Sequence, residues 1–372
     1  MSSSQTTYTD RIEAVLAEIW RDDRYRTIRT HELPAGMIDF SSNDYLAMAT
    51  DTRVVQALRT ARRAGSGGAR LLGGAHREHA LLEEELAQWL GRERALLFSS
   101  GYHAAIGAIP ALAETIGAVR SDERNHAAII DGVRLSRVPR TIYAHAKLAR
   151  TAQAAPALVV TESLFGMDGD ALNVRAVLEA LGADDAVLID EAHALGVIGA
   201  HGGGLAYGVD DPRIIVLGTL SKALGVHGGF VAGPSRVVEL LVNRARSFIF
   251  DTALPPSLAL AARIALRLVR DADDRRAEVA ARVLQLRRGL SALGFESDEH
   301  APGCIVPLQL GSEERALAVS AELWKQGVVA PAIRPPTVPK GTCRLRLSVR
   351  WDHTADAIDR LLQALESCIV SS

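Results

Sequence analysis

Short apolar runs recur through the middle of this chain, and helical stretches separate them. The runs occupy residues 94–100, 117–122, 157–163, 185–191, 213–218 and 228–233. Between them lie stretches with apolar residues at helical spacing, among them HALLEEELAQWL, YHAAIGAIPALAE and NVRAVLEAL. Strands that are apolar throughout and alternate with helices are typical of a mostly parallel sheet covered on both faces. The sequence therefore predicts an α/β fold built on a large sheet.

This rhythm changes after the helical region 256–270. The following residues predict a helix (277–293), a strand (304–310), another helix (315–327), strands around 328–333 and 343–349, and a last helix from Thr354. At 372 residues the chain is long enough for two domains. We expect an N-terminal helix and strand segment at 1–45, a large α/β domain at 46–270, and a small C-terminal α+β domain at 271–372. Within the last, the Pro-rich stretch RPPTVPKG is expected to form an ordered loop, because proline lacks the backbone N–H.

The N-terminal segment carries apolar residues at helical spacing, which predicts an amphipathic helix over 8–24 and a strand near MIDFSS. It lacks a cationic stretch followed by an apolar one, and no segment is apolar for the length of a membrane helix. We therefore expect a cytoplasmic protein with no membrane partner.

Charge and cysteine content exclude further classes of function. The chain has 42 basic and 44 acidic residues and a net charge of −2, which does not favour binding to nucleic acid. Its cysteines, Cys304, Cys343 and Cys368, lie far apart and form no CxxC pair. This spacing indicates neither a metal site nor a disulfide framework, so buried or idle thiols are expected.

One lysine stands in an unusual setting. Lys222 lies in GTLSKALG, among small and apolar residues, directly after the strand-like run RIIVLG. A lone lysine in a turn is usually a surface residue. Apolar surroundings, however, disfavour the charged amine and lower its pKa, which is how proteins obtain a lysine that forms a Schiff base or acts as a base.

Other polar residues follow neighbouring strands. Asp190 and His193 follow the strand DAVLID, and the carboxyl ends of parallel strands meet at one edge of a sheet. On their own, these two residues would more readily be read as a helix cap in which each satisfies the other. Ser100, Gly101 and Tyr102 close a strand and open a helix, which suits a phosphate. His126 stands at another such junction, where its ring could cover a heterocycle.

Together these groups match the requirements of pyridoxal 5′-phosphate (PLP). This cofactor needs a lysine for the Schiff base, a carboxylate at the pyridine nitrogen, a donor to the phenolic oxygen, a stacking ring and a phosphate cup. The sequence therefore predicts a PLP site centred on Lys222.

From about residue 10 to 368, the chain resembles the α-oxoamine synthase family of fold-type I PLP enzymes. The resemblance rests on FSSNDYLAM, GSGGARLLGG, HALLEEELAQWLG, FSSGY, NHA, MDGD, DEAHALGVIG, GTLSKALG and RPPTVPKGTCRLRLS. The pair DEAHxxGxxG and GTxxKxxG is highly specific for this superfamily. RPPTVP favours the biotin-pathway branch over glycine acetyltransferase, 5-aminolevulinate synthase and serine palmitoyltransferase.

The resemblance implies a role for each matching residue. It makes Lys222 the catalytic Schiff-base lysine, Asp190 the partner of the pyridine nitrogen, and His193 the donor to the phenolic oxygen. His126 becomes the residue that stacks on the cofactor and touches substrate. The remaining assignments are Gly101, Tyr102 and Thr219 at the phosphate, Thr252 at a phosphate across a dimer interface, Asn43 and Arg346 at the amino-acid carboxylate, and Arg26 and Thr337 at the acyl substrate.

Two positions depart from the family. Gly166 precedes MDGD where the family often has serine, so one side-chain contact to the cofactor is missing, and water or His193 would have to replace it. Ala105 replaces an asparagine common in GYxAN.

The implied reaction is the decarboxylative condensation of L-alanine with a pimeloyl thioester, of CoA or of a carrier protein. Its products are 8-amino-7-oxononanoate, CO₂ and free thiol, and the family implies a homodimer. Another α-oxoamine synthase, such as glycine C-acetyltransferase, is the alternative within the family. A catalytically silent binding protein on the same fold is the alternative from another class. The retention of Lys222 argues against it. The purified enzyme should be yellow, whereas a hydrolase or a dehydrogenase should not.

A hydrolase and a nicotinamide dehydrogenase have less support. HGGG at 201–204 is similar to a lipase oxyanion loop, but the chain has no G-x-S-x-G. GSGGAR at 65–70 is not G-x-G-x-x-G and does not follow an apolar strand.

Overall fold

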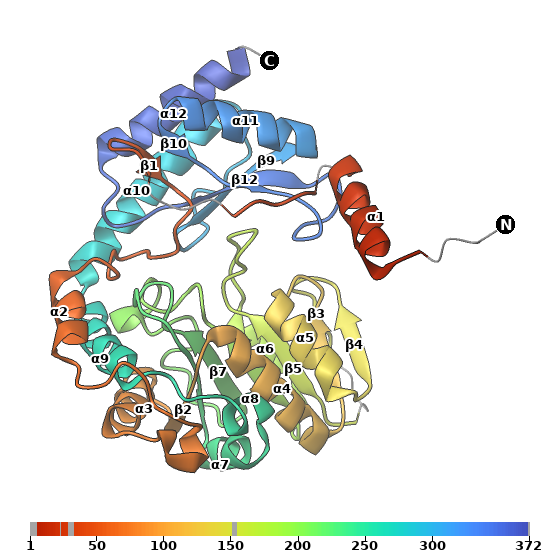
Figure 1. Ribbon diagram of the computed structural model, residues 1–372, viewed down its shortest axis with the longest axis vertical. Coiled ribbons are helices and arrows are strands. Elements are labelled where there is room, and N and C mark those ends of the chain that lie inside the picture. The colour runs from red at the N-terminus through yellow and green to blue at the C-terminus, as the bar shows by residue number, and fades with distance from the viewer. Residues whose placement is uncertain (1–5, 23, 29–32, 151–154, 371–372) are drawn as a thin grey trace.

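A computed structural model describes residues 6–22, 24–28, 33–150 and 155–370. Within these ranges, the largest element is a seven-stranded sheet in the lower half of Figure 1. All its strands run in one direction except β8, which is antiparallel to both its neighbours. Their order is β2 (Arg94–Phe98), β8 (Gly229–Gly233), β7 (Ile214–Thr219), β6 (Ala186–Asp190), β5 (Leu158–Glu162), β3 (Val119–Asp122) and β4 (Arg140–Tyr143).

Helices cover both faces of this sheet, because the central strands send apolar side chains in both directions. In β7, Ile214 and Val216 enter one core, whereas Ile215 and Leu217 enter the other. The first core is closed by α2 (Thr52–Thr60), α3 (Arg77–Leu90), α6 (Val174–Ala180) and α9 (Pro256–Arg270). The second is closed by α4 (Gly101–Ile116), α5 (Ala127–Ser136), α7 (Ser235–Arg244) and α8 (Arg246–Ile249). The prediction of a mostly parallel α/β sheet is confirmed.

A smaller antiparallel sheet, of order β11-β12-β9, lies in the upper half of Figure 1. Its strands are β9 (Ile305–Gly311), β11 (Ala332–Ile333) and β12 (Cys343–Ser348), and the helices beside it are α10 (Asp273–Ala292), α11 (Glu313–Lys325) and α12 (Ala355–Val370). The Pro-rich residues 334–341 form the turn-rich loop between β11 and β12. The three cysteines, which all lie in the described ranges, are buried, as the sequence predicted, and none of them forms a disulfide.

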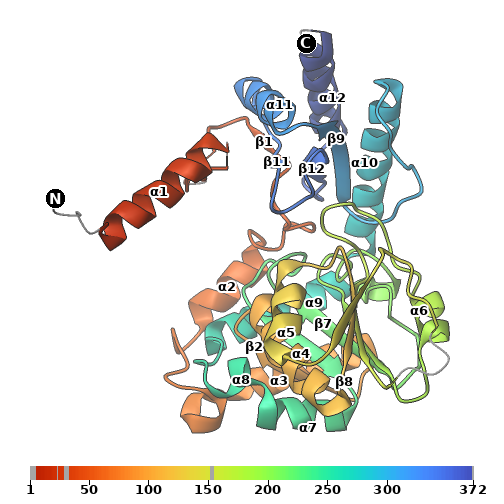
Figure 2. The same cartoon turned by 90° about the vertical axis from the view of Figure 1, so that its right-hand side faces the viewer.

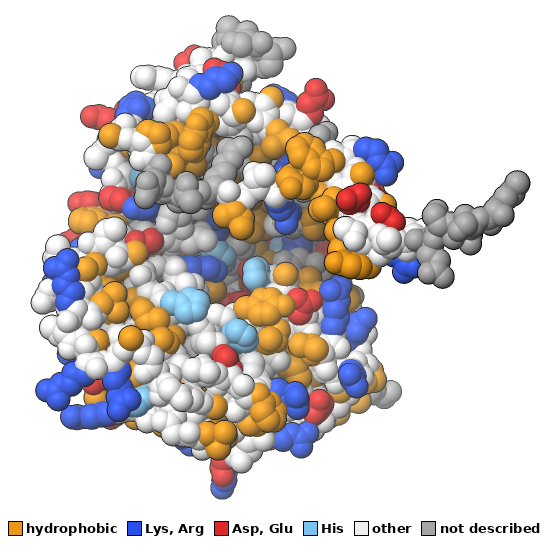
Figure 3. Space-filling model, in the orientation of Figure 1, with side chains coloured by type: hydrophobic (Ala, Val, Ile, Leu, Met, Phe, Trp, Pro, Cys, Tyr) orange, Lys and Arg blue, Asp and Glu red, His pale blue; other side chains and the backbone are white. Residues whose placement is uncertain are grey.

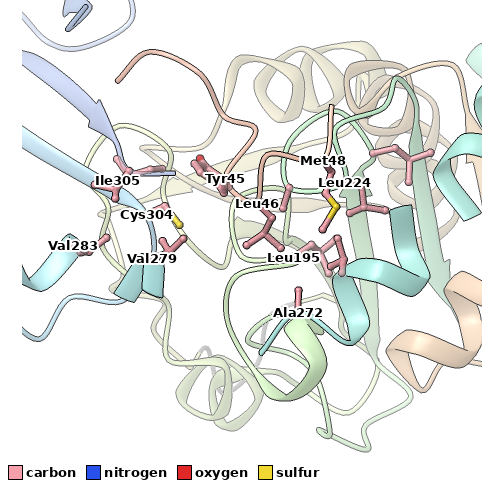
Figure 4. Packing of buried hydrophobic residues seen from close by; sticks show 14 of the residues in the cluster. Tyr45, Leu46, Met48, Leu195, Leu224, Ala272, Val279, Val283, Cys304 and Ile305 are labelled. Carbon is pink, nitrogen blue, oxygen red and sulfur yellow. The ribbon is translucent and has the colours of Figure 1, made fainter. Parts of the chain in front are cut away.

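The N-terminal segment joins the two parts of the molecule. β1 (Ile38–Asp39) pairs in parallel with β10 (Val328–Val329), so residues far apart in the chain lie side by side. Tyr45, Leu46 and Met48 then enter the same apolar cluster as Leu195 of the large part and Cys304 of the small part (Figure 4). The backbone N–H of Trp351 donates to Tyr45 O at 2.8 Å. This segment is therefore held from both sides.

Helix α1 (Tyr8–Arg21) stands apart from the rest of the chain in both ribbon views (Figures 1 and 2). A capping box from Thr7 and Asp10 begins it, as expected for an amphipathic helix. Its apolar residues are largely exposed, Trp20 to 61% and Ile12 to 51%. Across the described ranges, no helix is both long and apolar enough to cross a membrane.

Candidate active site

Polar side chains gather where the central strands of the large sheet end. Glu162 is the last residue of β5, Asp190 is the last of β6, and Lys222 follows the end of β7. Because parallel strands deliver their carboxyl ends to one edge, the fold brings these three residues together. Figure 3 shows histidine side chains in the hollow between the two parts of the molecule, on the side that this edge faces.

Lys222 lies at one end of a short chain of contacts. Its Nζ is 2.8 Å from His193 Nε2, and His193 Nδ1 is 2.7 Å from the hydroxyl of Tyr45. Burial lowers the pKa of Lys222 to about 8, although the carboxylates of Asp190 and Glu162 oppose this shift. Burial also lowers the pKa of His193 well below its usual range, and the charges of Lys222 and Arg346 lower it further. A largely neutral imidazole therefore faces an amine that readily loses its proton near neutral pH.

Two buried carboxyl groups lie on the same edge. Asp190 is 7% exposed, and its Oδ1 accepts a hydrogen bond from the Ala192 N–H at 2.9 Å. Burial raises the pKa of Asp190, and the charge of Lys222 opposes the shift. Glu162 accepts from the backbone N–H of His126 at 2.6 Å, and burial together with Asp190 raises its pKa to about 8. The protonation states of two acids and one amine at this edge therefore influence one another.

The expected phosphate-binding residues also lie together. Gly101 opens α4, and a Cβ at this position would be 3.2 Å from Thr219 Cβ. The hydroxyl of Ser100 caps the helix by accepting from the His103 N–H at 3.1 Å. The backbone N–H groups of this helix start, together with its dipole, can bind an anion beside Thr219. Tyr102 belongs to the same helix start, and its hydroxyl donates to Asp131 Oδ2 at 2.7 Å.

His126 caps α5 with its Nδ1, which accepts from the Ala128 N–H at 3.2 Å. Its imidazole is exposed, while its backbone N–H is fixed by Glu162. Asp190 and Lys222 are close enough to His126 to influence its protonation. An open ring face next to these groups can cover a flat heterocycle.

Arg346 projects from β12 of the small sheet toward this edge. Its Nη1 donates to Asn43 Oδ1 at 2.9 Å and to Ser348 Oγ at 3.1 Å, and its Nε donates to Gly166 O. Among the described residues, Nη2 finds no hydrogen-bond partner, although it is buried. A buried guanidinium N–H left without an acceptor is costly, so this atom indicates a place for an anionic ligand such as a carboxylate.

β12 also holds the first residues of MDGD through a second arginine. Arg344 Nη1 donates to Met167 O at 3.3 Å and pairs with Asp168. Together, Arg344 and Arg346 bind the carbonyl groups or side chains of residues 166–168 in the large part. The small sheet therefore fixes a loop of the large sheet's edge.

Three predicted substrate or cofactor residues lie outside this cluster. The side chains of Arg26, Thr252 and Thr337 are exposed. Arg26 follows the stacked pair Trp20 and Tyr25, whose ring centroids are 4.4 Å apart. Within the described residues, no hydrogen bond joins these three side chains to Lys222, Asp190 or His193.

The two departures from the family fall in different places. A Cβ at Gly166 would lie 2.4 Å from His193 Nε2, so the imidazole occupies the space that a larger residue would need. Ala105 is fully buried in the core beneath α4.

Sequence reasoning did not single out Tyr45 or Glu162. Glu162 ends a predicted strand just as Asp190 does, so the same strand-end argument could have found it. Tyr45 stands inside FSSNDYLAM, but nothing in that pattern indicates that its hydroxyl reaches His193, which is 148 residues away.

These residues fit PLP. They supply a buried amine, a carboxylate for the pyridine nitrogen, a ring face, an anion-binding helix start, and an arginine N–H still available to a substrate carboxylate. Among the residues that the structure describes, no group of three or more His, Cys, Asp or Glu is arranged to hold a metal ion.

Comparisons with known proteins agree with this arrangement. The model of the family "Aminotransferase class I and II" matches residues 35–365. An 8-amino-7-oxononanoate synthase of Anaeromyxobacter dehalogenans is 46% identical, with 90% of this chain and 86% of the relative covered. One from Methylococcus capsulatus is 41% identical, with 96% and 97% covered.

Solved structures show the same likeness. A serine palmitoyltransferase from S. paucimobilis with bound PLP and myriocin superposes with a TM-score of 0.89 at 28% identity, covering 98% of this chain and 99% of that one. An 8-amino-7-oxononanoate synthase from Francisella tularensis superposes with a TM-score of 0.78 at 25% identity, covering 91% and 99%.

Proposed function

This chain belongs to the aminotransferase class I and II family of PLP enzymes, and we propose that it condenses L-alanine with a pimeloyl thioester to give 8-amino-7-oxononanoate, CO₂ and free thiol. The relatives that share most of its length support the choice of substrates. The structural observation that carries the proposal is Arg346 Nη2, which is buried and unpaired among the described residues. Arg346 lies close enough to Lys222 to lower the pKa of that lysine.

Each bond of the reaction can be followed. The Cα of alanine forms a bond to the acyl carbon, the thiolate leaves and takes up a proton, and the original carboxylate departs as CO₂. The bound cofactor supplies a sink for the electron pair left on Cα. The protein must therefore bind one carboxylate, move one proton at Cα, and keep the pyridine nitrogen protonated.

The described side chains match these tasks. Arg346, steadied by Asn43, binds the alanine carboxylate. Lys222, whose pKa is about 8, takes the Cα proton as a neutral amine and later returns it. Asp190 holds the proton of the pyridine nitrogen, and His193 donates to the phenolic oxygen. His126 covers the ring and lies next to the new ketone.

Thiol release across a matrix of amino acids and acyl thioesters tests this function. Alanine with pimeloyl-CoA, or with a pimeloyl carrier protein, is expected to give the highest kcat/KM. Because serine palmitoyltransferases superpose closely, serine with palmitoyl-CoA is the informative competitor. A preference for serine and a long acyl chain, or for glycine and acetyl-CoA, would move the chain to another branch of the family.

We propose that Arg26 binds the distal carboxylate of the pimeloyl chain. Arg26→Ala is then expected to raise the KM for the pimeloyl thioester about tenfold or more, because a charge-assisted hydrogen bond is lost. An octanoyl thioester, which lacks that carboxylate, should be affected far less. Steady-state kinetics with both thioesters measure the difference.

Arg24→Ala is the matched control, since Arg24 is a neighbouring exposed arginine that pairs with Asp22 at 3.5 Å. Equal losses for both thioesters in Arg26→Ala would mean that Arg26 acts through folding or the cofactor. Unchanged kinetics would remove it from the acyl site.

We also propose a homodimer in which Thr252 reaches the partner's cofactor phosphate. Thr252 follows Phe250, which is 70% exposed, and Leu72 is 84% exposed. Exposed apolar side chains that lie together are typical of an interface, and residues 70–74, which include Leu72, contact α8 just before Phe250. Sedimentation should give twice the mass of one chain, and Phe250→Asp should dissociate the dimer, whereas Ile142→Asp at the exposed edge strand β4 should not. A wild-type monomer at micromolar concentration would refute the proposal.

A further inference from the structure

Tyr45 links the histidine beside Lys222 to the segment that carries Asn43. We infer that Tyr45 is a positioning residue whose hydroxyl donates to His193 Nδ1 and thereby fixes the imidazole tautomer that points Nε2–H into the active site. The inference rests on the proposed PLP function, because it assigns the orientation of a donor to that cofactor. Nothing in the reaction itself requires a tyrosine at this position.

The hydroxyl proton of Tyr45 has two possible acceptors. His193 Nδ1 is 2.7 Å from the hydroxyl, whereas Asn43 Oδ1 is 3.2 Å away and already accepts from Arg346 Nη1. The shorter contact and the stronger acceptor are both on the imidazole side. Burial raises the pKa of Tyr45 far above its usual value, so the phenol keeps its proton over the working pH range.

The ring nitrogen that carries the proton of His193 then follows from the contacts of the other nitrogen. The charged groups that face this imidazole are Lys222, Arg346 and His126, and each favours its neutral form. A neutral imidazole has one N–H. If Nδ1 accepts from Tyr45, this N–H is on Nε2, the atom 2.8 Å from Lys222 Nζ. Above its pKa of about 8, Lys222 is neutral and its amine can accept this hydrogen bond. A phenolic oxygen can accept it when the cofactor is present.

Position 166 makes this tautomer more important. Glycine there supplies no hydroxyl, and the imidazole fills the space where a Cβ would lie 2.4 Å from Nε2. Donation to the phenolic oxygen from this side therefore depends on His193 alone. The other tautomer would present a lone pair to that oxygen and repel it.

Burial and backbone hydrogen bonds hold Tyr45 in a fixed position. Its side chain is 0% exposed, and Leu46 and Met48 beside it are packed in the core that joins both parts of the molecule (Figure 4). Its backbone N–H donates to Asn43 O at 2.8 Å, and its carbonyl accepts from Trp351. A hydroxyl on such a support can orient an imidazole with little loss of entropy on each turnover.

Nitrogen NMR of the cofactor-free wild-type protein, with ¹⁵N-labelled histidine rings, tests the tautomer directly. His193 is expected to show an unprotonated Nδ1 and a protonated Nε2 at about pH 9.5, where Lys222, whose pKa is about 8, is neutral and can accept from Nε2. A proton on Nδ1 would overturn the inference, because Tyr45 would then accept from His193 rather than donate to it. This measurement needs no variant and no substrate, so it stands even if the proposed reaction is wrong.

Tyr45→Phe removes only the hydroxyl. In the PLP-loaded enzyme, the pH midpoint of the absorbance change near neutral pH is expected to rise by about one unit, because a donor that stabilises the phenolate form is weakened. We expect kcat to fall about tenfold with little change in the KM for alanine. Tyr143→Phe, at a partly buried tyrosine of β4, should change neither quantity.

Two results would contradict the role. An unchanged midpoint in Tyr45→Phe, with normal melting temperature and cofactor content, would show that the hydroxyl does not act on His193. A large rise in the KM for alanine with an unchanged midpoint would show instead that Tyr45 acts through Asn43 and Arg346.

Discussion

Replacing Lys222 by alanine is expected to reduce turnover by about 10⁴-fold or more, because covalent capture of the cofactor and proton transfer at Cα both depend on this amine. Borohydride reduction of the wild-type enzyme followed by peptide mapping measures the first role. The chain contains only four lysines, Lys147, Lys222, Lys325 and Lys340, so the assignment is unambiguous. The pyridoxyl label should be recovered on Lys222 alone.

Lys325→Ala serves as the matched control, since Lys325 is exposed on α11 and pairs with Glu322 at 2.8 Å. It should retain wild-type turnover and colour. Label on Lys147, Lys325 or Lys340, or substantial activity in Lys222→Ala, would overturn the assignment of the active-site lysine.

Asp190→Asn is expected to raise the barrier by about 3 kcal/mol, which is roughly two orders of magnitude in kcat. The amide occupies the same volume and can still contact the pyridine nitrogen, so the cofactor should remain bound. It cannot hold a proton on that nitrogen, and the electron pair on Cα is then poorly stabilised. Single-turnover kinetics, together with the cofactor content of the variant, separate loss of chemistry from loss of binding.

Glu162→Gln tests whether the effect is specific to Asp190. Both carboxyl groups are buried at the ends of neighbouring strands, but Glu162 contacts the backbone N–H of His126. Glu162→Gln should therefore cost less in kcat than Asp190→Asn. Near-normal turnover in Asp190→Asn, or an equal loss in both variants, would show that the pyridine nitrogen does not lie at Asp190.

The apolar content of each strand explains whether the sequence could predict it. β5, β6 and β7 are buried on both faces and appear in the sequence as continuous apolar runs. β4 has the sequence RTIY, and Arg140, Thr141 and Ile142 in it are exposed. Unlike β2, the buried strand at the other edge of the sheet, β4 has little buried surface and leaves no apolar run to detect. It was absent from the predicted strands for this reason.

The residues of the site also differ in how far the sequence alone could predict them. Strand ends indicated Asp190 and Lys222, because the geometry of a parallel sheet is regular. The positions of Asn43 and Arg346 were expected only from the resemblance, and their contact spans 303 residues. The link from Tyr45 to His193 depends on packing between the N-terminal segment and both parts of the molecule, which no local pattern encodes. The roles of Arg26, Thr252 and Thr337 stay predictions.

Arg346 and Asn43 show that the residues we assign to substrates and those we assign to the cofactor ring lie in different parts of the sequence. The side chains that we assign to the cofactor ring lie between His126 and Lys222. Apart from His126, which we assign to both, those assigned to substrates lie before residue 46 or after residue 330. Substitutions near the two ends of the chain can therefore change which amino acid or acyl group is accepted while Lys222 and Asp190 themselves are retained. Because of this division, a few substitutions can change the substrate that this fold accepts. A redesign of specificity should therefore begin with residues near the two ends of the chain.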